Sequence, residues 1–375
     1  MFRMIVAIVL LAAGLANAAE YESKYFRFAT DLRRDQAKEL FIRLDRAYEQ
    51  FERDFAFVRP REERKAGLLQ AAVFTNKAAY LKAGAWTKTD GAYDPGKKTL
   101  FVFFHPGTDW PVVVHEAFHQ YAEERIGGGP WPAWLNEGTA QYYQHALFTG
   151  DGYHPGAIWA TDVDYNASVV QGRPFHPLSR LLVMSQKEWN ARYLYELYHE
   201  SWSVVHYLRH SDADNRGLYE SFVQGVADAR SAKDVAAAWR ALVPDDKAFE
   251  QGWRRYWAAN SKDNTAAIAQ QAIALTALSG IARVNETHGR QVRDLEQFFK
   301  MGQSGQLALK DTPELWLPPA LFVATFSARD RAGQWRLDYD AAGKPAITAR
   351  LKSGVTIEAH LTGDAGNERP TVTTK

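Results

Sequence analysis

Cysteine is absent from the 375 residues of the sequence. Disulfide bonds therefore cannot cross-link the fold, a thiol cannot serve as a nucleophile, and a lipid cannot be attached through an N-terminal cysteine. A metal ion, if one is bound, must take its ligands from histidine and carboxylate side chains.

An excess of charge of either sign is also missing. Lys and Arg number 45 and Asp and Glu number 44, which gives a formal net charge of +1. This balance favours neither nucleic acid nor an anionic membrane as the main partner, so we expect no nucleic-acid partner. Aromatic residues make up 13% of the chain, which is typical of a folded enzyme rather than a disordered protein.

Long apolar stretches are missing from the chain beyond residue 18. Residues 1–18 differ from the rest because they combine a positive charge, an apolar run and small residues. Arg3 supplies a positive charge, residues 5–15 are apolar, and Ala16 and Ala18 are small residues at the positions that a signal peptidase reads. This order predicts a signal peptide cleaved after Ala18, and the alternative is an N-terminal membrane anchor. The apolar run is short beside the about 20 residues that span a bilayer, so we expect a periplasmic or secreted chain without stable membrane insertion.

The most informative segment is a predicted helix over residues 109–126, which contains the pattern His115-Glu116-x-x-His119. Residues four apart lie on one face of a helix, so both imidazoles can reach a single metal ion. Glu116 follows the first histidine directly, where a general base for the attacking water has to lie. The alternative is a helix that carries two exposed or core histidines.

A zinc peptidase site needs a third protein ligand and one open position. Glu137 lies 18 positions after His119 (137 − 119), on a second predicted helix over residues 132–148. A Gly- and Pro-rich turn between the two helices lets the second fold back across the first. We therefore expect one Zn²⁺ per chain, held by His115, His119 and Glu137. The alternative is that Glu137 caps its own helix or faces solvent.

Together these motifs resemble the gluzincin zinc metallopeptidases, especially the bacterial peptidase-MA-like proteins, over about residues 20–260. The motifs are His115-Glu116-x-x-His119 and Asn136-Glu137-Gly138-x-Ala140. The resemblance implies an α+β catalytic domain, with a mixed sheet beside the active-site helix and a mostly helical second part. It also implies that an edge strand aligns an extended peptide, and residues 99–104 are our candidate.

The resemblance further implies a downstream Tyr or His that donates a hydrogen bond to the oxyanion. Tyr198 is the candidate, with Tyr195, His199 and His206 as alternatives. The sequence departs from relatives of this kind at two points. The Gly-x-Met-Glu-Asn motif of aminopeptidases is missing, and Gln141 stands where thermolysin-like relatives use an acidic residue to orient the first histidine.

The order of the predicted elements indicates four segments. They are a signal peptide at 1–18, a gluzincin-like peptidase domain at 19–260, a helical connector at 261–315 and a small β module at 316–375. Within them, apolar spacing predicts one helix starting at Thr30 or Asp31 and ending near residue 55, and another over residues 189–210. Residues 335–339 and 346–351 flank a turn and are expected to form a hairpin.

The sequence therefore predicts a zinc metallopeptidase that hydrolyses peptide bonds outside the cytoplasm, with an endopeptidase favoured and a peptide or protein as substrate. One alternative is a non-catalytic binding or scaffold protein on the same fold, which contacts a cell-envelope partner through its C-terminal module. Another is a zinc amidohydrolase of a non-peptide substrate, because the motif does not distinguish the two amides.

Overall fold

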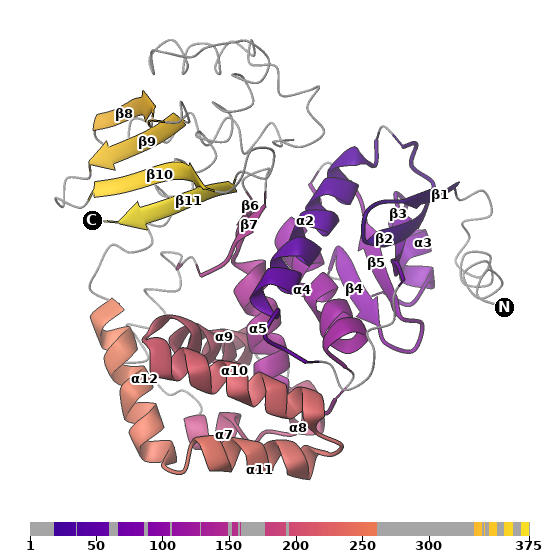
Figure 1. The fold of residues 1–375 in the computed structure, drawn as a ribbon. Coiled ribbons are helices and arrows are strands. Elements are labelled where there is room, and N and C mark those ends of the chain that lie inside the picture. The colour runs from indigo at the N-terminus through magenta and orange to yellow at the C-terminus, as the bar shows by residue number, and fades with distance from the viewer. Residues whose placement is uncertain are drawn as a thin grey trace. The chain divides into compact units, whose positions relative to one another are not determined.

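The computed structural model divides into two compact units, residues 1–146 with 161–263 and residues 147–160 with 264–375 (Figure 1). The residues that it describes are 19–34, 36–59, 67–85, 89–105, 107–127, 129–148, 152–156, 158, 177–192, 195–260, 334–339, 341, 345–350, 356–362 and 369–374. The expected signal peptide at 1–18 and the expected connector at 261–315 lie outside the described residues. No helix in the described part of the chain is long and apolar enough to cross a membrane.

A five-stranded sheet in the order β1-β2-β3-β5-β4 forms the first half of the larger unit. Its strands are β1 (Ala19–Glu22), β2 (Phe26–Thr30), β3 (Leu69–Phe74), β4 (Gly91–Asp94) and β5 (Thr99–Phe103). The three central strands run parallel, and β1 and β4 are added antiparallel at the two edges. The prediction of a mixed α+β fold with a mixed sheet is therefore confirmed.

The expectation that residues 99–104 form an edge strand is wrong. β5 pairs in parallel with β3 on one side and antiparallel with β4 on the other. Its continuous run of apolar residues is that of a strand buried on both faces, which belongs in the interior of a sheet. The edge strand on this side of the sheet is β4, which was not predicted from the sequence.

Helices α2 (Lys38–Asp54), α3 (Lys77–Lys82) and α4 (Trp110–Tyr121) accompany this sheet, and α4 continues into a π-helix over Ala122–Gly127. The start predicted for the helix at Thr30 or Asp31 is wrong, because Thr30 is the last residue of β2. Its hydroxyl accepts a hydrogen bond from the backbone N–H of Leu32 at 3.1 Å, inside a turn that precedes α2.

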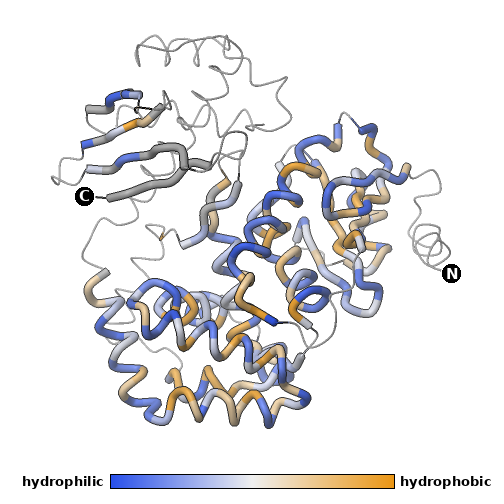
Figure 2. Tube along the Cα trace, viewed as in Figure 1, coloured by the Kyte–Doolittle hydropathy of each residue, from blue (hydrophilic) through white to orange (hydrophobic). Residues whose placement is uncertain are grey.

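The second half of the larger unit is helical. Its helices are α5 (Ala133–Gln144), α7 (Leu178–Leu181), α8 (Gln186–Arg192), α9 (Tyr195–His210), α10 (Ala213–Asp228), α11 (Ala232–Leu242) and α12 (Asp246–Asn260). The structure has α8 and α9 in place of the single helix expected over residues 189–210. Hydrophobic and hydrophilic residues alternate along these helices, as expected for helices that bury one face (Figure 2).

Helix α5 occupies the central position because it packs against both α4 and α9. The contact with α9 is unusually close at Gly138, where an added Cβ atom would lie 2.6 Å from the backbone oxygen of Ser201. A residue without a side chain is therefore required at this point of the helix.

The smaller unit contains an antiparallel sheet in the order β11-β10-β9-β8 and a short pair of strands. The sheet is made of β8 (Gln334–Tyr339), β9 (Pro345–Arg350), β10 (Thr356–Thr362) and β11 (Arg369–Thr374), and the pair of β6 (Leu147–Phe148) and β7 (Tyr153–His154). β8 and β9 pair antiparallel over Gln334–Tyr339 and Pro345–Arg350, so the predicted hairpin is confirmed.

The contact at Gly138 makes a testable prediction about stability. Gly138→Ala should lower the free energy of unfolding by about 1–3 kcal/mol, because the added methyl group forces α5 away from α9. Urea unfolding followed by circular dichroism measures this change.

Gly217→Ala is the matched control. Gly217 lies inside α10, and an added Cβ would have no atom within 4 Å. This variant should be stabilised by about 0.5–1 kcal/mol, because alanine loses less backbone entropy than glycine. Equal effects of the two substitutions would contradict the steric argument.

Candidate metal centre

Helix α4 carries three of the predicted site residues, and its start is defined by the sequence. The side chain of Asp109 accepts a hydrogen bond from the backbone N–H of Val112 at 3.4 Å, and proline occupies the first turn. The helix lies close to β4, because an added Cβ at Gly91 would be 3.1 Å from the Cα of Val113 and 3.4 Å from the Cγ of Glu116. Glycine at this position therefore brings Glu116 against the edge of the sheet.

Helix α5 supplies the third residue of the predicted ligand set. The chain reverses after the π-helix. Gly127, the last residue of that helix, has a φ of 121°, and Pro132 directly precedes α5. The returning helix begins at Ala133 and packs against α4, so that Glu137 faces the two histidines.

The structure brings His115, His119 and Glu137 together. The Nε2 atom of His115 lies 3.3 Å from the Oε2 atom of Glu137, and the Nε2 atom of His119 lies 3.5 Å from it. One ligand atom from each side chain lies within 4.8 Å of the other two, a spacing that can hold a metal ion. Tetrahedral zinc with bonds of about 2.0–2.2 Å places its ligand atoms about 3.3–3.6 Å apart, so both distances to Glu137 fit this ion.

Glu137 and His119 shift each other's pKa in opposite directions. Burial raises the pKa of Glu137, but the charge of His119 and the bonds from both histidines outweigh it and hold that pKa well below its usual range. Burial lowers the pKa of His119, but the carboxylate of Glu137 outweighs it and raises that pKa to about 9. Glu137 is therefore ionised at neutral pH, as a carboxylate ligand of a metal has to be, whereas His119 has to release a proton when a metal binds.

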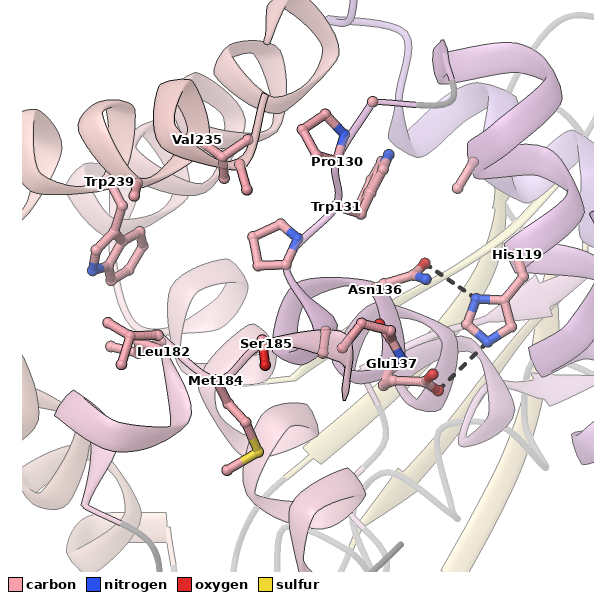
Figure 3. Close-up of a pocket in the computed structure, with 18 of the residues that line it drawn as sticks. His119, Pro130, Trp131, Asn136, Glu137, Leu182, Met184, Ser185, Val235 and Trp239 are labelled. Atoms are coloured by element: carbon pink, nitrogen blue, oxygen red, sulfur yellow. Dashed lines mark hydrogen bonds and ion pairs between the residues drawn. The ribbon is translucent and has the colours of Figure 1, made fainter. Parts of the chain in front are cut away.

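A hydrogen bond from His119 to the amide oxygen of Asn136 orients one histidine. The Nδ1 atom of His119 lies 3.1 Å from the Oδ1 atom of Asn136, and Figure 3 shows both this contact and the one to Glu137. An imidazole that binds a metal through Nε2 commonly donates its other N–H in this way. The role of Asn136 was not predicted from the sequence, although the residue stands directly before Glu137 in the motif.

Gln141, the possible partner of the first histidine, bonds elsewhere. Its Nε2 atom lies 3.1 Å from the Nε2 atom of His145. The Nδ1 atom of His115 is buried and has no hydrogen-bond partner among the described residues.

Glu116 lies beside the three residues and contacts the edge strand. Its Oε2 atom accepts a hydrogen bond from the backbone N–H of Tyr93 in β4 at 2.9 Å. Glu116 lines the same cleft as His115, His119 and Glu137, so its carboxylate is available to a molecule that reaches all three. The missed strand β4 thus positions a predicted catalytic residue.

Among the four candidates for the oxyanion donor, Tyr198 alone lines this cleft. Its ring centroid lies 6.3 Å from that of His115 and 5.3 Å from that of Trp189. Tyr195 is 69% exposed, whereas His199 and His206 are buried and their rings lie 5.1 and 5.3 Å from that of Trp202.

The cleft has a volume of about 1520 Å³ and reaches from β4 and α4 to α11. Figure 3 shows His119, Asn136 and Glu137 on one side and Leu182, Met184, Val235 and Trp239 on the other. Pro130 and Trp131, from the turn between the two ligand-bearing helices, also line it.

A family model described as a protein of unknown function, DUF1570, matches residues 110–224, which is less than a third of the chain. The matched segment begins at the first residue of α4 and ends within α10, so it includes the three candidate ligands, Glu116 and Tyr198. No curated protein matches the chain.

The hydrogen bond between His119 and Asn136 makes a prediction about metal affinity. Asn136→Ala should weaken zinc binding on the order of 10- to 100-fold, because His119 loses the acceptor that orients its ring. Titration of the purified protein with zinc against a competing chelator measures the change.

Two further variants test the assignment. Asn136→Asp retains an acceptor and should bind zinc at least as well as Asn136→Ala does. Gln141→Ala should have a much smaller effect, because Gln141 contacts His145 rather than a candidate ligand. Equal losses in Asn136→Ala and Gln141→Ala would contradict the role of Asn136.

Proposed function

We propose that the protein is a zinc-dependent metallopeptidase on a gluzincin-like fold, which hydrolyses peptide bonds outside the cytoplasm. The proposal rests on one observation above all: His115, His119 and Glu137 meet at ligand distances while Glu116 lines the same cleft. The composition of residues 1–18 supports export, although these residues lie outside the described part of the structure.

Two imidazoles and one carboxylate form a donor set that suits zinc and leaves a fourth position open. Zinc bound there would polarise the scissile carbonyl group and lower the pKa of the attacking water. The role of the three ligand side chains is to hold the ion at a fixed place, and that of Asn136 is to fix the ring of His119.

Glu116 is the proposed general base. Its carboxylate takes a proton from the attacking water and then passes this proton to the nitrogen of the leaving amine. The hydrogen bond from Tyr93 holds one carboxylate oxygen, which leaves the other oxygen for the proton transfer. Tyr198 is the proposed donor of a hydrogen bond to the oxyanion that forms at the carbonyl.

The size and lining of the cleft support a peptide as the substrate. Its volume of about 1520 Å³ exceeds the about 300–1,000 Å³ of pockets for single small molecules. Strand β4 is an edge strand beside Glu116, and such an edge can bind an extended chain through the backbone groups other than the N–H of Tyr93, which donates to Glu116. The cleft extends from the candidate ligands toward both β4 and α11, which supports cleavage within a chain rather than at its end.

The first test separates metal binding from chemistry. Glu116→Gln should retain about one zinc ion per chain and lose about 100- to 10,000-fold in turnover, because an amide cannot carry the proton. His119→Ala should lose zinc itself. Metal content is measured by mass spectrometry, and turnover is measured on unfolded protein substrates and quenched peptides.

Glu124→Gln is the control for the test of Glu116. Glu124 lies on the π-helix that continues α4, and its carboxylate pairs with Lys98 at 2.6 Å instead of lining the cleft. This variant should retain both zinc and turnover. Zinc in the unaltered protein without cleavage of any peptide would favour a binding role, and retained zinc in His119→Ala would overturn the ligand assignment.

The proposed role of Tyr198 makes a separate prediction. Tyr198→Phe should lower kcat about 100- to 1,000-fold with little change in KM, because the lost hydrogen bond acts on the oxyanion and not on the bound substrate. Tyr195→Phe, on the same helix but 69% exposed, should leave both constants unchanged. A change confined to KM in Tyr198→Phe would contradict this role.

A further inference from the structure

Four apolar side chains line the part of the cleft that lies across from the candidate ligands, with polar residues such as Ser185 and Arg240 beside them. Leu182 and Met184 come from the segment between α7 and α8, and Val235 and Trp239 come from α11. All four side chains are buried and line the cleft, and Figure 3 shows them opposite His119 and Glu137. We refer to the space between these four residues as the apolar chamber.

Residues of α11 itself define where this helix begins and which of its faces lines the chamber. Ser231 and Asp234 form a reciprocal capping box at its start, with hydrogen bonds of 3.3 and 2.9 Å. Val235 and Trp239 are four residues apart and therefore lie on the same face of the helix. Ala236 also lines the cleft, whereas Ala237 is exposed outside it.

The chamber is connected to the helix that carries Glu137. The ring of Trp239 lies 5.3 Å from that of Trp134 and 4.8 Å from that of Phe222. Trp134 belongs to α5 and precedes Asn136 by two residues. A side chain seated against Trp239 is therefore held at a fixed place relative to the candidate metal centre.

We propose that the apolar chamber is a specificity subsite, which binds one bulky apolar side chain of the size of Leu or Phe from a peptide lying in the cleft. This inference rests on the proposed function, since it names the kind of peptide that the same site accepts. A charged side chain would lose hydration among these four residues, none of which carries a charge, whereas a large apolar side chain gains by leaving water. Met184 has a flexible side chain that can adjust to occupants of different shape, so both Leu and Phe fit.

The experiment measures peptide binding and thus does not depend on turnover. Fluorescently labelled peptides, in which one position at a time carries Ala, Asp, Leu or Phe, are titrated with the Glu116→Gln protein in the presence of zinc. At one position, Leu and Phe should bind on the order of 10- to 100-fold more tightly than Ala, and Asp should bind more weakly than Ala.

Two neighbouring residues of α11 provide a matched pair of variants. Ala236→Phe, added to Glu116→Gln, places a ring in the cleft beside the chamber and should remove the preference for Leu and Phe while the Ala peptide binds as before. Ala237→Phe adds the same ring on the exposed side of the same helix and should keep the preference. Both positions are accessible to solvent to some degree, so neither substitution has to be accommodated in the core.

The outcomes separate this inference from the proposed function. Equal binding of the Ala, Leu and Phe peptides at every position, or the same result for Ala236→Phe and Ala237→Phe, would overturn the subsite. Cleavage is measured in parallel with the unaltered protein. Selective binding without cleavage would support the subsite and overturn the peptidase proposal. Cleavage without selective binding would support the peptidase proposal and overturn the subsite.

Discussion

The approach of α5 to α9 at Gly138 is the contact on which the candidate metal centre depends. Helix α5 lies between α9 on one side and α4 on the other, and Glu137 is the neighbour of Gly138 in the chain. Metal sites tolerate errors of only about 0.2 Å in ligand distances. A side chain at Gly138 would meet the backbone of Ser201 and displace the helix by more than this, because the added Cβ would lie only 2.6 Å from an oxygen atom. Gly91 has the same role on the other side, where it sets the distance between α4 and β4.

A half-buried ion pair fixes the far end of α5. Arg209 of α9 pairs with Asp54, at the end of α2, at 2.9 Å, and the hydroxyl group of Tyr143 donates to the same Asp54 oxygen at 2.7 Å. The guanidinium group also lies 4.4 Å from the ring centre of Tyr142. An ion pair that is shielded from water is favourable when its remaining hydrogen bonds are satisfied, and these contacts supply them. Helices α2, α5 and α9 thus meet at the carboxylate of Asp54. This contact holds the C-terminal end of α5 and so helps to keep the helix in the orientation that points Glu137 at the two histidines.

The candidate ligands could be predicted from the sequence because their arrangement is mostly local. The spacing of His115 and His119 determines their common face once the helix is recognised, and the turn before α5 brings Glu137 back toward them. The role of Asn136 was harder to predict from the sequence, because the direction of its side chain depends on how the two helices pack. Its position beside Glu137 was the only signal.

Two of the errors, the edge strand and the start of the first helix, arose where pairing between strands decides the outcome. Strand β4 is four residues long and lacks an alternating pattern, so nothing local marks it as the edge of the sheet. The apolar run of β5 indicates burial on both faces, and this should have argued for an interior strand. The apolar chamber had no signal at all, since Met184 and Val235 are far apart in the sequence and meet only through the packing of α11.

The two walls of the cleft address different parts of a peptide. A polypeptide carries hydrogen-bonding groups along its backbone and varied side chains beside it. The edge of β4 is complementary to the backbone groups, and the apolar chamber is complementary to an apolar side chain. Because Glu116 contacts β4 and Trp239 contacts the helix of Glu137, both walls are connected to the residues proposed to carry out the reaction. A chain bound by both walls would have its position along the cleft fixed by one side chain and its direction fixed by the strand, which is what selection of a single bond requires.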